Sequence, residues 1–383
     1  MGIHAHIGAE APIRFYRPDY PLRTPGMRSP DYVQVSRAAA ITLGLVPGTM
    51  HRTACTHCLN LLLTYPEGCR ANCAYCGLAR HREEARDFAD RNFGRVEWPT
   101  ARFQDLIDRV LAGGDHGRFE RMCIAMITHP RAETDTFVLL RQWAQALPQV
   151  PVSILSNPTT LGREAVVAMR EAGADIFTVA LDAVTPAIFE RTRGRAVASP
   201  HSWQHYWQAI RWAAEIFGPE KFGVHLICGL GETEQELLQV AQRVRELGGH
   251  NHLFAFFPEQ GSLMEDWAPV ARAQWRRVQL ACYLIDHGGG GLQEMRFDAA
   301  GRVLDYGLEP AALVALVASG KPFRTSGCPG NSDQTVSACN RPYGDCRPTD
   351  ILSFPFAPES KDLDIIRRQL AGEDVSTFEP DLD

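Results

Sequence analysis

The chain has 383 residues, of which 45% are apolar, and its formal net charge is −6. This length suits one large domain with extensions or two ordinary domains, and the mild acidity speaks against a nucleic acid as the partner. We find no signal peptide, membrane-length apolar run or fixed-period repeat, so we expect a cytoplasmic protein without a membrane partner. Eleven cysteines in such a chain indicate metal ligands or buried thiols rather than disulfides.

The chain begins with a segment, residues 1–50, that is rich in Pro, Arg and Tyr and shows no apolar period. We expect it to be an extension draped over the domain. Cys55 and Cys58 come next, followed by a Leu-rich strand over residues 59–63. An extended strand would hold both thiols about 20 Å from Cys69, which follows it. Cys55 and Cys58 are therefore candidate ligands of a metal site that does not include Cys69.

Strand and helix patterns then alternate through residue 257. The predicted strands cover residues 121–127, 151–155, 175–181, 222–228 and 252–257, and the predicted helices cover residues 99–113, 134–147, 161–172, 203–217 and 234–247. This order is typical of an α/β protein with a parallel sheet and right-handed crossovers. We expect a partial or full (β/α) TIM-like barrel, whose site lies at the carboxyl ends of the strands.

The pattern is less regular beyond residue 270. We expect a helix over 271–287, a short strand over 294–298, a helix over 309–319, and one short helix within the final segment, 357–383. The predicted divisions are an extension (1–50), a barrel core (51–270), a C-terminal part of the barrel (271–325) and an irregular cysteine-rich segment with the tail (326–383).

Three closely spaced thiols follow the Leu-rich strand. Cys69, Cys73 and Cys76 have the spacing C-x3-C-x2-C. Structural zinc and plain electron carriers use four protein ligands, whereas three thiolates bind three irons of a cubane and leave the fourth iron open. The alternatives are a structural zinc site or a chance spacing, but an incomplete set favours a cluster that binds something at its open iron.

This spacing resembles the radical S-adenosylmethionine (SAM) superfamily, in which the open iron holds SAM and one electron cleaves it to a 5′-deoxyadenosyl radical. The resemblance implies that Tyr75 lies near the adenine and that Asp182 contacts the ribose. It also implies that the backbone of Gly229, Gly231 and Glu232 packs on the adenine, since glycine allows close approach. The plainer readings are a helix cap for Asp182 and an ordinary turn for the glycines.

Over residues 59–305 the chain resembles biotin synthase, on the stretches 121–130, 181–182, 229–233 and 296–302. Residues 271–325 then look like the biotin- and thiamin-synthase-associated part of that barrel. Cys123 and Arg296 match two of the four residues that hold a [2Fe–2S] cluster in biotin synthase. The other two positions fall near Leu155 and Gly223, which cannot ligate iron. We therefore expect no such cluster, and Cys123 to be a buried small side chain or a substrate-facing thiol.

Three more cysteines, Cys328, Cys339 and Cys346, stand among Gly, Pro and Asn. Irregular chain of this kind can bend around a cubane and donate N–H groups to its sulfides; free surface thiols are the alternative. Gly-Cys328-Pro-Gly and Cys339-Asn-Arg-Pro-Tyr resemble the tail of archaeal-type, two-protein lipoyl synthases and their bacterial counterparts. Those proteins carry an auxiliary [4Fe–4S] cluster. Its fourth ligand here is left open between Cys55, Cys58 and a serine, Ser326 or Ser337.

The resemblance implies a lipoyl synthase-like enzyme that uses SAM and two [4Fe–4S] clusters to insert sulfur into an octanoyl chain. The implied partners are an octanoylated carrier protein (glycine-cleavage-H-like or a lipoate-binding protein), a second radical SAM subunit, and a ferredoxin or flavodoxin. The first alternative is another biotin-synthase-like enzyme that acts on a small molecule, such as a carbon-skeleton mutase of the methylornithine synthase kind. The second is a non-catalytic iron–sulfur carrier, which would have no use for Asp182.

Overall fold

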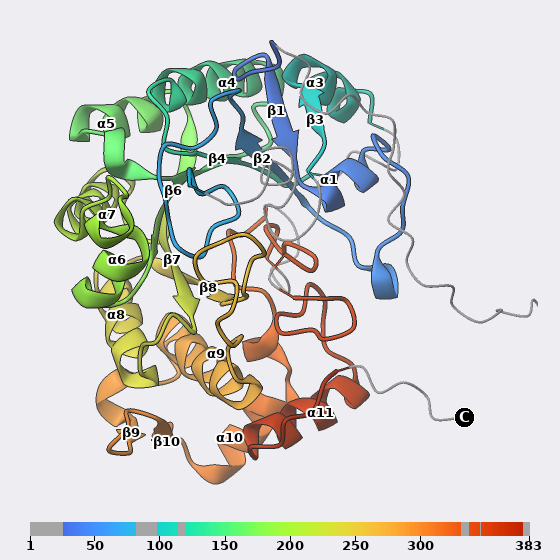
Figure 1. The fold of residues 1–383 in the computed structure, drawn as a ribbon. Coiled ribbons are helices and arrows are strands. Elements are labelled where there is room, and N and C mark those ends of the chain that lie inside the picture. Colours follow the sequence, from blue (N-terminus) through green and yellow to red (C-terminus); the bar gives the residue numbers. More distant parts are fainter. Residues whose placement is uncertain (1–25, 82–97, 114–118, 331–336, 345, 378–383) are drawn as a thin grey trace, which may run out of the picture.

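The computed structural model describes residues 26–81, 98–113, 119–330, 337–344 and 346–377 (Figure 1). The strands are β1 (Tyr32–Val35), β2 (Cys58–Leu63), β3 (Thr100–Arg102), β4 (Arg121–Ala125), β5 (Val152–Ser156), β6 (Ala174–Asp182), β7 (Phe222–Cys228), β8 (His250–Ala255), β9 (Arg296–Phe297) and β10 (Val303–Asp305). The α-helices are α1 (Arg37–Thr42), α3 (Phe103–Leu111), α4 (Ala132–Ala146), α5 (Arg163–Glu171), α6 (Pro186–Arg193), α7 (Trp203–Phe217), α8 (Glu234–Glu246), α9 (Arg272–His287), α10 (Pro310–Ala318) and α11 (Ser360–Leu370).

One eight-stranded sheet organises the fold, in the order β3-β1-β2-β4-β5-β6-β7-β8. From β2 onward, neighbouring strands are parallel and follow the chain, which confirms the predicted α/β class and parallel sheet. The edge strands β3 and β8 do not pair with each other, so the described sheet is an open barrel rather than a closed one.

The two faces of the sheet have different surroundings. Side chains alternate along each strand, and those of Leu61, Ile124 and Val224 point into the main hydrophobic core. Helices α4 to α9 follow the outer arc of the sheet (Figure 1). The inner face carries the intervening residues, among them Asn60 and Cys123, which are partners in the β2–β4 register.

The chain before residue 51 differs from the prediction. Residues 1–25 of the expected extension lie outside the described residues, but β1 adds to the sheet, antiparallel to both β2 and β3. Its apolar residues Val33 and Val35 are fully buried, and they are too few to show a period in the sequence. No described helix has both the length and the apolar character that a membrane crossing requires.

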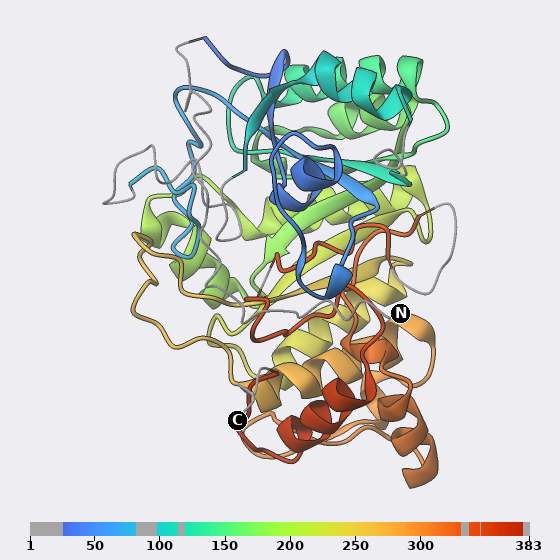
Figure 2. The same cartoon turned by 90° about the vertical axis from the view of Figure 1, so that its right-hand side faces the viewer.

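The irregular C-terminal segment crosses the inner, open side of the barrel. Ser326 Oγ accepts a hydrogen bond of 2.8 Å from the Leu253 N–H on β8. Asn60 Nδ2, on β2, donates to Cys339 Sγ at 3.3 Å. Both views show this red segment beside the blue chain that precedes β2 (Figures 1 and 2), where Tyr343 donates a hydrogen bond to the His51 carbonyl. The segment therefore spans from one edge region of the sheet to β2.

Candidate functional site

The three-thiol loop leaves the carboxyl end of β2 and is held by the turn after β4 and by the end of α6. The Arg70 N–H donates to the Thr128 carbonyl at 2.8 Å, and the Ala74 N–H donates to the Thr192 carbonyl at 2.6 Å. Backbone N–H groups of Ala71 and Leu78 point at the sulfurs of Cys69 and Cys76, each at 3.4 Å. Two of the three thiols, those of Cys69 and Cys76, therefore already have a backbone N–H donor beside the sulfur.

The donor set of this loop fits an iron–sulfur cluster. Burial raises the pKa of Cys73 to about 12 and also raises the pKa values of Cys69 and Cys76, and the three thiols lie close enough to act on one another. Among the described residues, no three Cys, His, Asp or Glu side chains converge tightly enough to hold a single metal ion. A cluster instead needs one thiolate for each protein-bound iron, and this loop offers three.

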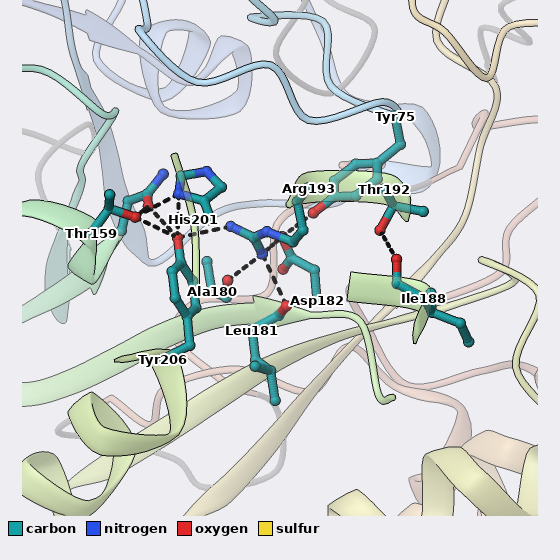
Figure 3. Close-up of polar contacts among 11 residues, drawn as sticks. Tyr75, Thr159, Ala180, Leu181, Asp182, Ile188, Thr192, Arg193, His201 and Tyr206 are labelled. Carbon is teal, nitrogen blue, oxygen red and sulfur yellow. Dashed lines mark hydrogen bonds and ion pairs between the residues drawn. The ribbon is translucent and has the colours of Figure 1, made fainter. Parts of the chain in front are cut away.

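Asp182, at the end of β6, lies beside this loop. Tyr75 Oη donates to Asp182 Oδ2 at 2.5 Å, and Arg193 Nη1 approaches the same oxygen at 2.5 Å (Figure 3). Burial keeps the pKa of Tyr75 well above its usual value, so the phenol stays a donor. Asp182 Oδ1 has no hydrogen-bond partner among the described residues. It is a free acceptor of the kind that a ribose hydroxyl needs.

Arg193 was not singled out from the sequence, yet it fixes this carboxylate. It is only 2% exposed, and it also donates to the Leu181 carbonyl at 2.9 Å and to Tyr206 Oη at 3.1 Å (Figure 3). Asp182 has a φ of 61°, an unfavourable angle for a residue with a side chain. The arginine bonds hold the strand end in this conformation.

The segment after β7 was predicted to approach the adenine. Gly229 has a φ of 111°, and a Cβ there would lie 2.9 Å from the Phe256 Cβ, so packing within the protein already requires glycine. Glu232 is 7% exposed and turns inward, where Oε1 accepts from the Gly229 N–H at 2.5 Å and Oε2 has no partner within the described chain. Gly231, with a φ of 98°, lies near Arg191, which donates to the Leu230 carbonyl. The adenine contacts of all three remain a prediction.

A second group of thiols lies on the inner face of the barrel. Cys58 of β2, Cys123 of β4, and Cys328 and Cys339 of the C-terminal segment pack together, with Ile176 and Leu155 as apolar neighbours, in a cluster separate from the main core. None of the four is more than 9% exposed. We call these four cysteines the buried thiol group.

Hydrogen bonds and charge favour one thiolate within this group. Asn60 Nδ2 lies 3.4 Å from Cys58 Sγ and 3.3 Å from Cys339 Sγ. The hydrogen bond from Cys58 lowers the pKa of Cys339 to about 6, and the charge of Arg341 acts in the same direction. Burial raises the pKa of Cys58 well above its usual value. Within this pair the hydrogen bond therefore favours the thiolate at Cys339 over the thiolate at Cys58.

The structure brings together some, but not all, of the residues that the sequence named as ligands for the tail. Cys346 packs in the main core, apart from the buried thiol group, and Cys55 is exposed, with its sulfur 3.4 Å from His57 Nε2. The two serines are also engaged elsewhere: Ser326 with Leu253, and Ser337 with the Thr325 carbonyl. Of the four candidates for the fourth ligand, Cys58 is the one that packs beside Cys328 and Cys339. Cys123, expected to be a buried small side chain or a substrate-facing thiol, is buried beside these three cysteines because its strand position is in register with Asn60.

Arg296 does not lie in the barrel. It is on β9, in a separate two-stranded sheet, with its side chain 76% exposed and paired to Asp305. The inner face instead presents two histidines that the sequence analysis missed. His225 and His252 stack with ring centroids 5.4 Å apart, and burial lowers both pKa values well below the usual range. The sequence could have indicated them, because side chains alternate between the two faces of a strand and both histidines fall at positions of the inner face.

Among known protein families, residues 63–244 match the radical SAM superfamily. No curated protein matches the chain. Similar solved structures include methylornithine synthase (PylB), with 13% identity over 65% of this chain and 66% of that one and a TM-score of 0.45. HydG, a maturase of the [FeFe]-hydrogenase, has 13% identity over 59% and 48%, with a TM-score of 0.44. The methyltransferase TsrM from Kitasatospora setae has 12% identity over 65% and 43%, with a TM-score of 0.38.

These structural likenesses are too low to carry an argument about function, and the matched parts span 66%, 48% and 43% of those chains. The open parallel barrel with a three-thiol loop at its carboxyl end defines an α/β protein of the cluster-binding class. The family match makes this assignment specific: the chain carries a radical SAM superfamily domain over residues 63–244. The superfamily implies a [4Fe–4S] cluster and SAM.

Proposed function

We propose that this protein is a radical SAM enzyme that inserts sulfur into an octanoyl chain, in the manner of the lipoyl synthases. One observation carries the proposal. Cys328 and Cys339, of the segment that resembles the lipoyl synthase tail, are buried on the inner face of the barrel beside two barrel cysteines. A second cluster in this position would face the interior, where a substrate must lie to react with both groups.

The chemistry requires a radical, because an unactivated C–H bond is too strong for acid–base catalysis. Bound SAM supplies a 5′-deoxyadenosyl radical once it is reduced, and the second cluster supplies the sulfur. Cys69, Cys73 and Cys76 would hold the first cluster. Asp182, oriented by Tyr75 and Arg193, would accept a ribose hydroxyl through its free Oδ1. The inner face then has to exclude water and orient the substrate carbon.

The partners belong to the same proposal. The octanoyl chain would be carried on a lysine of a small protein, either glycine-cleavage-H-like or a lipoate-binding protein. A second radical SAM subunit would share the two sulfur insertions, and a ferredoxin or flavodoxin would deliver the electrons in the cytoplasm.

One observation favours a second candidate, a biotin-synthase-like enzyme that acts on a small polar molecule, such as a carbon-skeleton mutase. His225, on β7, feels the charges of both Arg193, which pairs with Asp182, and Arg341, which lies two residues after Cys339. A neutral imidazole there suits a polar substrate better than an alkyl chain. Such a mutase needs no second cluster, so iron content separates the two candidates.

The test is anaerobic reconstitution followed by iron and sulfide analysis. The sulfur-insertion proposal expects about eight irons per chain, since each cubane holds four. Incubation with SAM, a reductant and an octanoylated carrier protein should then give a thio-octanoyl product by mass spectrometry. The variant with Cys69, Cys73 and Cys76 all replaced by Ala should form no 5′-deoxyadenosine. Cys282→Ala, at a buried core cysteine on α9, is the matched control.

Two results would contradict the proposal. Wild-type protein with only about four irons would favour the mutase. Octanoyl carrier recovered unchanged, from protein that holds both clusters and cleaves SAM, would exclude the octanoyl substrate.

A further inference from the structure

We infer that Cys58, Cys123, Cys328 and Cys339 are the complete ligand set of a second [4Fe–4S] cluster, one with a protein thiolate on every iron. This inference rests on the proposed function only for the use of the cluster, not for its existence. It differs from the expectation based on the tail alone, because two of the four ligands come from barrel strands. Only Cys123 lies within residues 63–244, so three of the four ligands lie outside the matched superfamily domain.

The placement of the four thiols is the first argument. Three separate parts of the chain bring them together: the start of β2, the middle of β4, and the C-terminal segment. Buried cysteines scattered by chance would pack into the main core, as Cys228, Cys282 and Cys346 do. Here the four instead form a cluster of their own, closed by Leu155 and Ile176.

The charges around the group are the second argument. A cubane with four thiolates is an anion, and a buried anion needs donors and positive charge close by. Arg121 is 2% exposed, and Arg341 lies two residues after Cys339; both act electrostatically on these thiols. Asn60 Nδ2 adds an N–H donor within 3.4 Å of two of the sulfurs.

Glycines beside the tail cysteines are the third argument. A Cβ at Gly327 would collide with the carbonyl of Cys339, so only glycine lets the two cysteine-bearing segments approach this closely. The Cys339 N–H donates to the Cys328 carbonyl at 3.1 Å across the same contact. Pro329, the residue after Cys328, is held in place because its carbonyl accepts a hydrogen bond of 2.6 Å from Arg121 Nε. The tail is thus folded specifically to present both thiols.

Four thiolates can bind either a cubane or a single zinc ion, which draws its four sulfurs to about 2.3 Å. Because the three-thiol loop indicates that this chain is loaded with an iron–sulfur cluster, the cubane is the group inferred here, and metal analysis distinguishes the two. The difference between the two groups is the number of ligands: three in the loop, which leaves an open iron, and four in the buried thiol group.

The decisive protein is the Cys69/Cys73/Cys76→Ala variant, which should retain only the second cluster. We expect about four irons per chain and no zinc, with a Mössbauer spectrum of one all-thiolate cubane. Adding SAM or cyanide should leave the electron paramagnetic resonance signal of the reduced cluster unchanged, because no iron is open. Zinc in place of iron, or a signal shifted by these small ligands, would overturn the inference.

Single substitutions in the otherwise wild-type chain identify the ligands. Replacing Cys58, Cys123, Cys328 or Cys339 by Ala should each reduce the iron content from about eight toward about four. Gly327→Ala should do the same while keeping every thiol. Cys346→Ala and Cys55→Ala are the matched controls and should keep about eight. Continued reductive cleavage of SAM shows that a variant has folded.

The inference and the proposed function fail in different ways. If Cys58→Ala and Cys123→Ala keep both clusters, or if Cys346→Ala loses as much iron as Cys339→Ala, the ligand set is wrong, while sulfur insertion from a tail cluster could still be observed. If the four substitutions behave as expected but wild-type protein yields no thio-octanoyl product, the cluster is correct and the sulfur-insertion function is wrong.

Discussion

At the scale of single residues, Asp182 depends on its neighbours more than the sequence indicates. One of its oxygens is occupied by Tyr75 and Arg193, and the other is free of partners among the described residues. Arg193 is almost fully buried and needs this carboxylate. Asp182 therefore has one oxygen committed to the fold and one open to a ligand, and a substitution must separate the two.

Asp182→Ala should weaken SAM binding by about 1–3 kcal/mol, the usual loss when a charged hydrogen-bond partner is removed. Isothermal titration of the anaerobic protein measures this. Asp182→Asn keeps an acceptor for Arg193 and controls for misfolding, while Tyr75→Phe keeps the carboxylate and should cost less. SAM affinity unchanged in both Asp182 variants would reduce the residue to an anchor for Arg193.

Asp286, on α9, links stability to pH. It accepts from Asn251 Nδ2 at 2.6 Å, but burial raises its pKa to about 7. The folded protein therefore binds a proton there that the unfolded chain has already released, so stability falls as pH rises from about 4 to about 7. The loss in free energy of unfolding that comes from ionising buried Asp286 is complete above pH 7 and is at most about 4 kcal/mol.

The measurement is urea unfolding between pH 4 and pH 8. Asp286→Asn, which cannot ionise, should lose this part of the pH dependence and be relatively more stable at pH 8 than at pH 5. Parallel profiles for the wild type and the variant would mean that Asp286 is already charged in the folded protein at pH 5.

At the scale of elements, the regular parts of the chain follow from local sequence. Helix α7 and strand β7 have the bounds that their apolar periods and flanking Gly predict. The thiol sites were only partly predictable. Cys69 and Cys76 are only a few residues apart, so their spacing in the sequence identifies the site. Cys58 and Cys339 are 281 positions apart (339 − 58), and no local pattern shows that they meet. Sequence proximity instead favoured Cys346, which the structure places in the core.

Arg121 connects several elements. Its side chain donates to Ser153 on β5 at 2.9 Å, to Asp175 on β6 at 2.8 Å, and to the Pro329 carbonyl. Arg121→Met should lower the free energy of unfolding by about 3–5 kcal/mol, the usual cost of breaking a buried ion pair. Chemical denaturation measures this.

Lys221→Met is the matched control, because Lys221 pairs with the same Asp175 but its side chain is 45% exposed. Exposed pairs contribute about 1 kcal/mol or less. Equal losses in the two variants would show that the contacts of Arg121 with β5 and the tail add nothing.

At the scale of the whole molecule, the sequence predicts the parallel barrel but not how its open side is closed. Strand periods fix which residues face inward, and the order β2 to β8 follows the chain. The strand periods do not predict where the C-terminal segment lies, because its Gly- and Pro-rich chain has no apolar period. Its path is set by single contacts, such as Ser326 with β8 and Asn60 with Cys339.

The crossing of that segment also sets the order of events during synthesis. Cys58 and Cys123 leave the ribosome long before Cys328 and Cys339, so the barrel strands can form while half of the thiol group does not yet exist. Joining the two halves closes loops of 205 (328 − 123) to 281 (339 − 58) residues, and the entropy cost of this closure arises only at the end of translation. If the buried thiol group holds a cluster as proposed, its iron would be loaded late, after translation. A chain truncated before residue 328 would then lose this group while keeping every strand of the barrel.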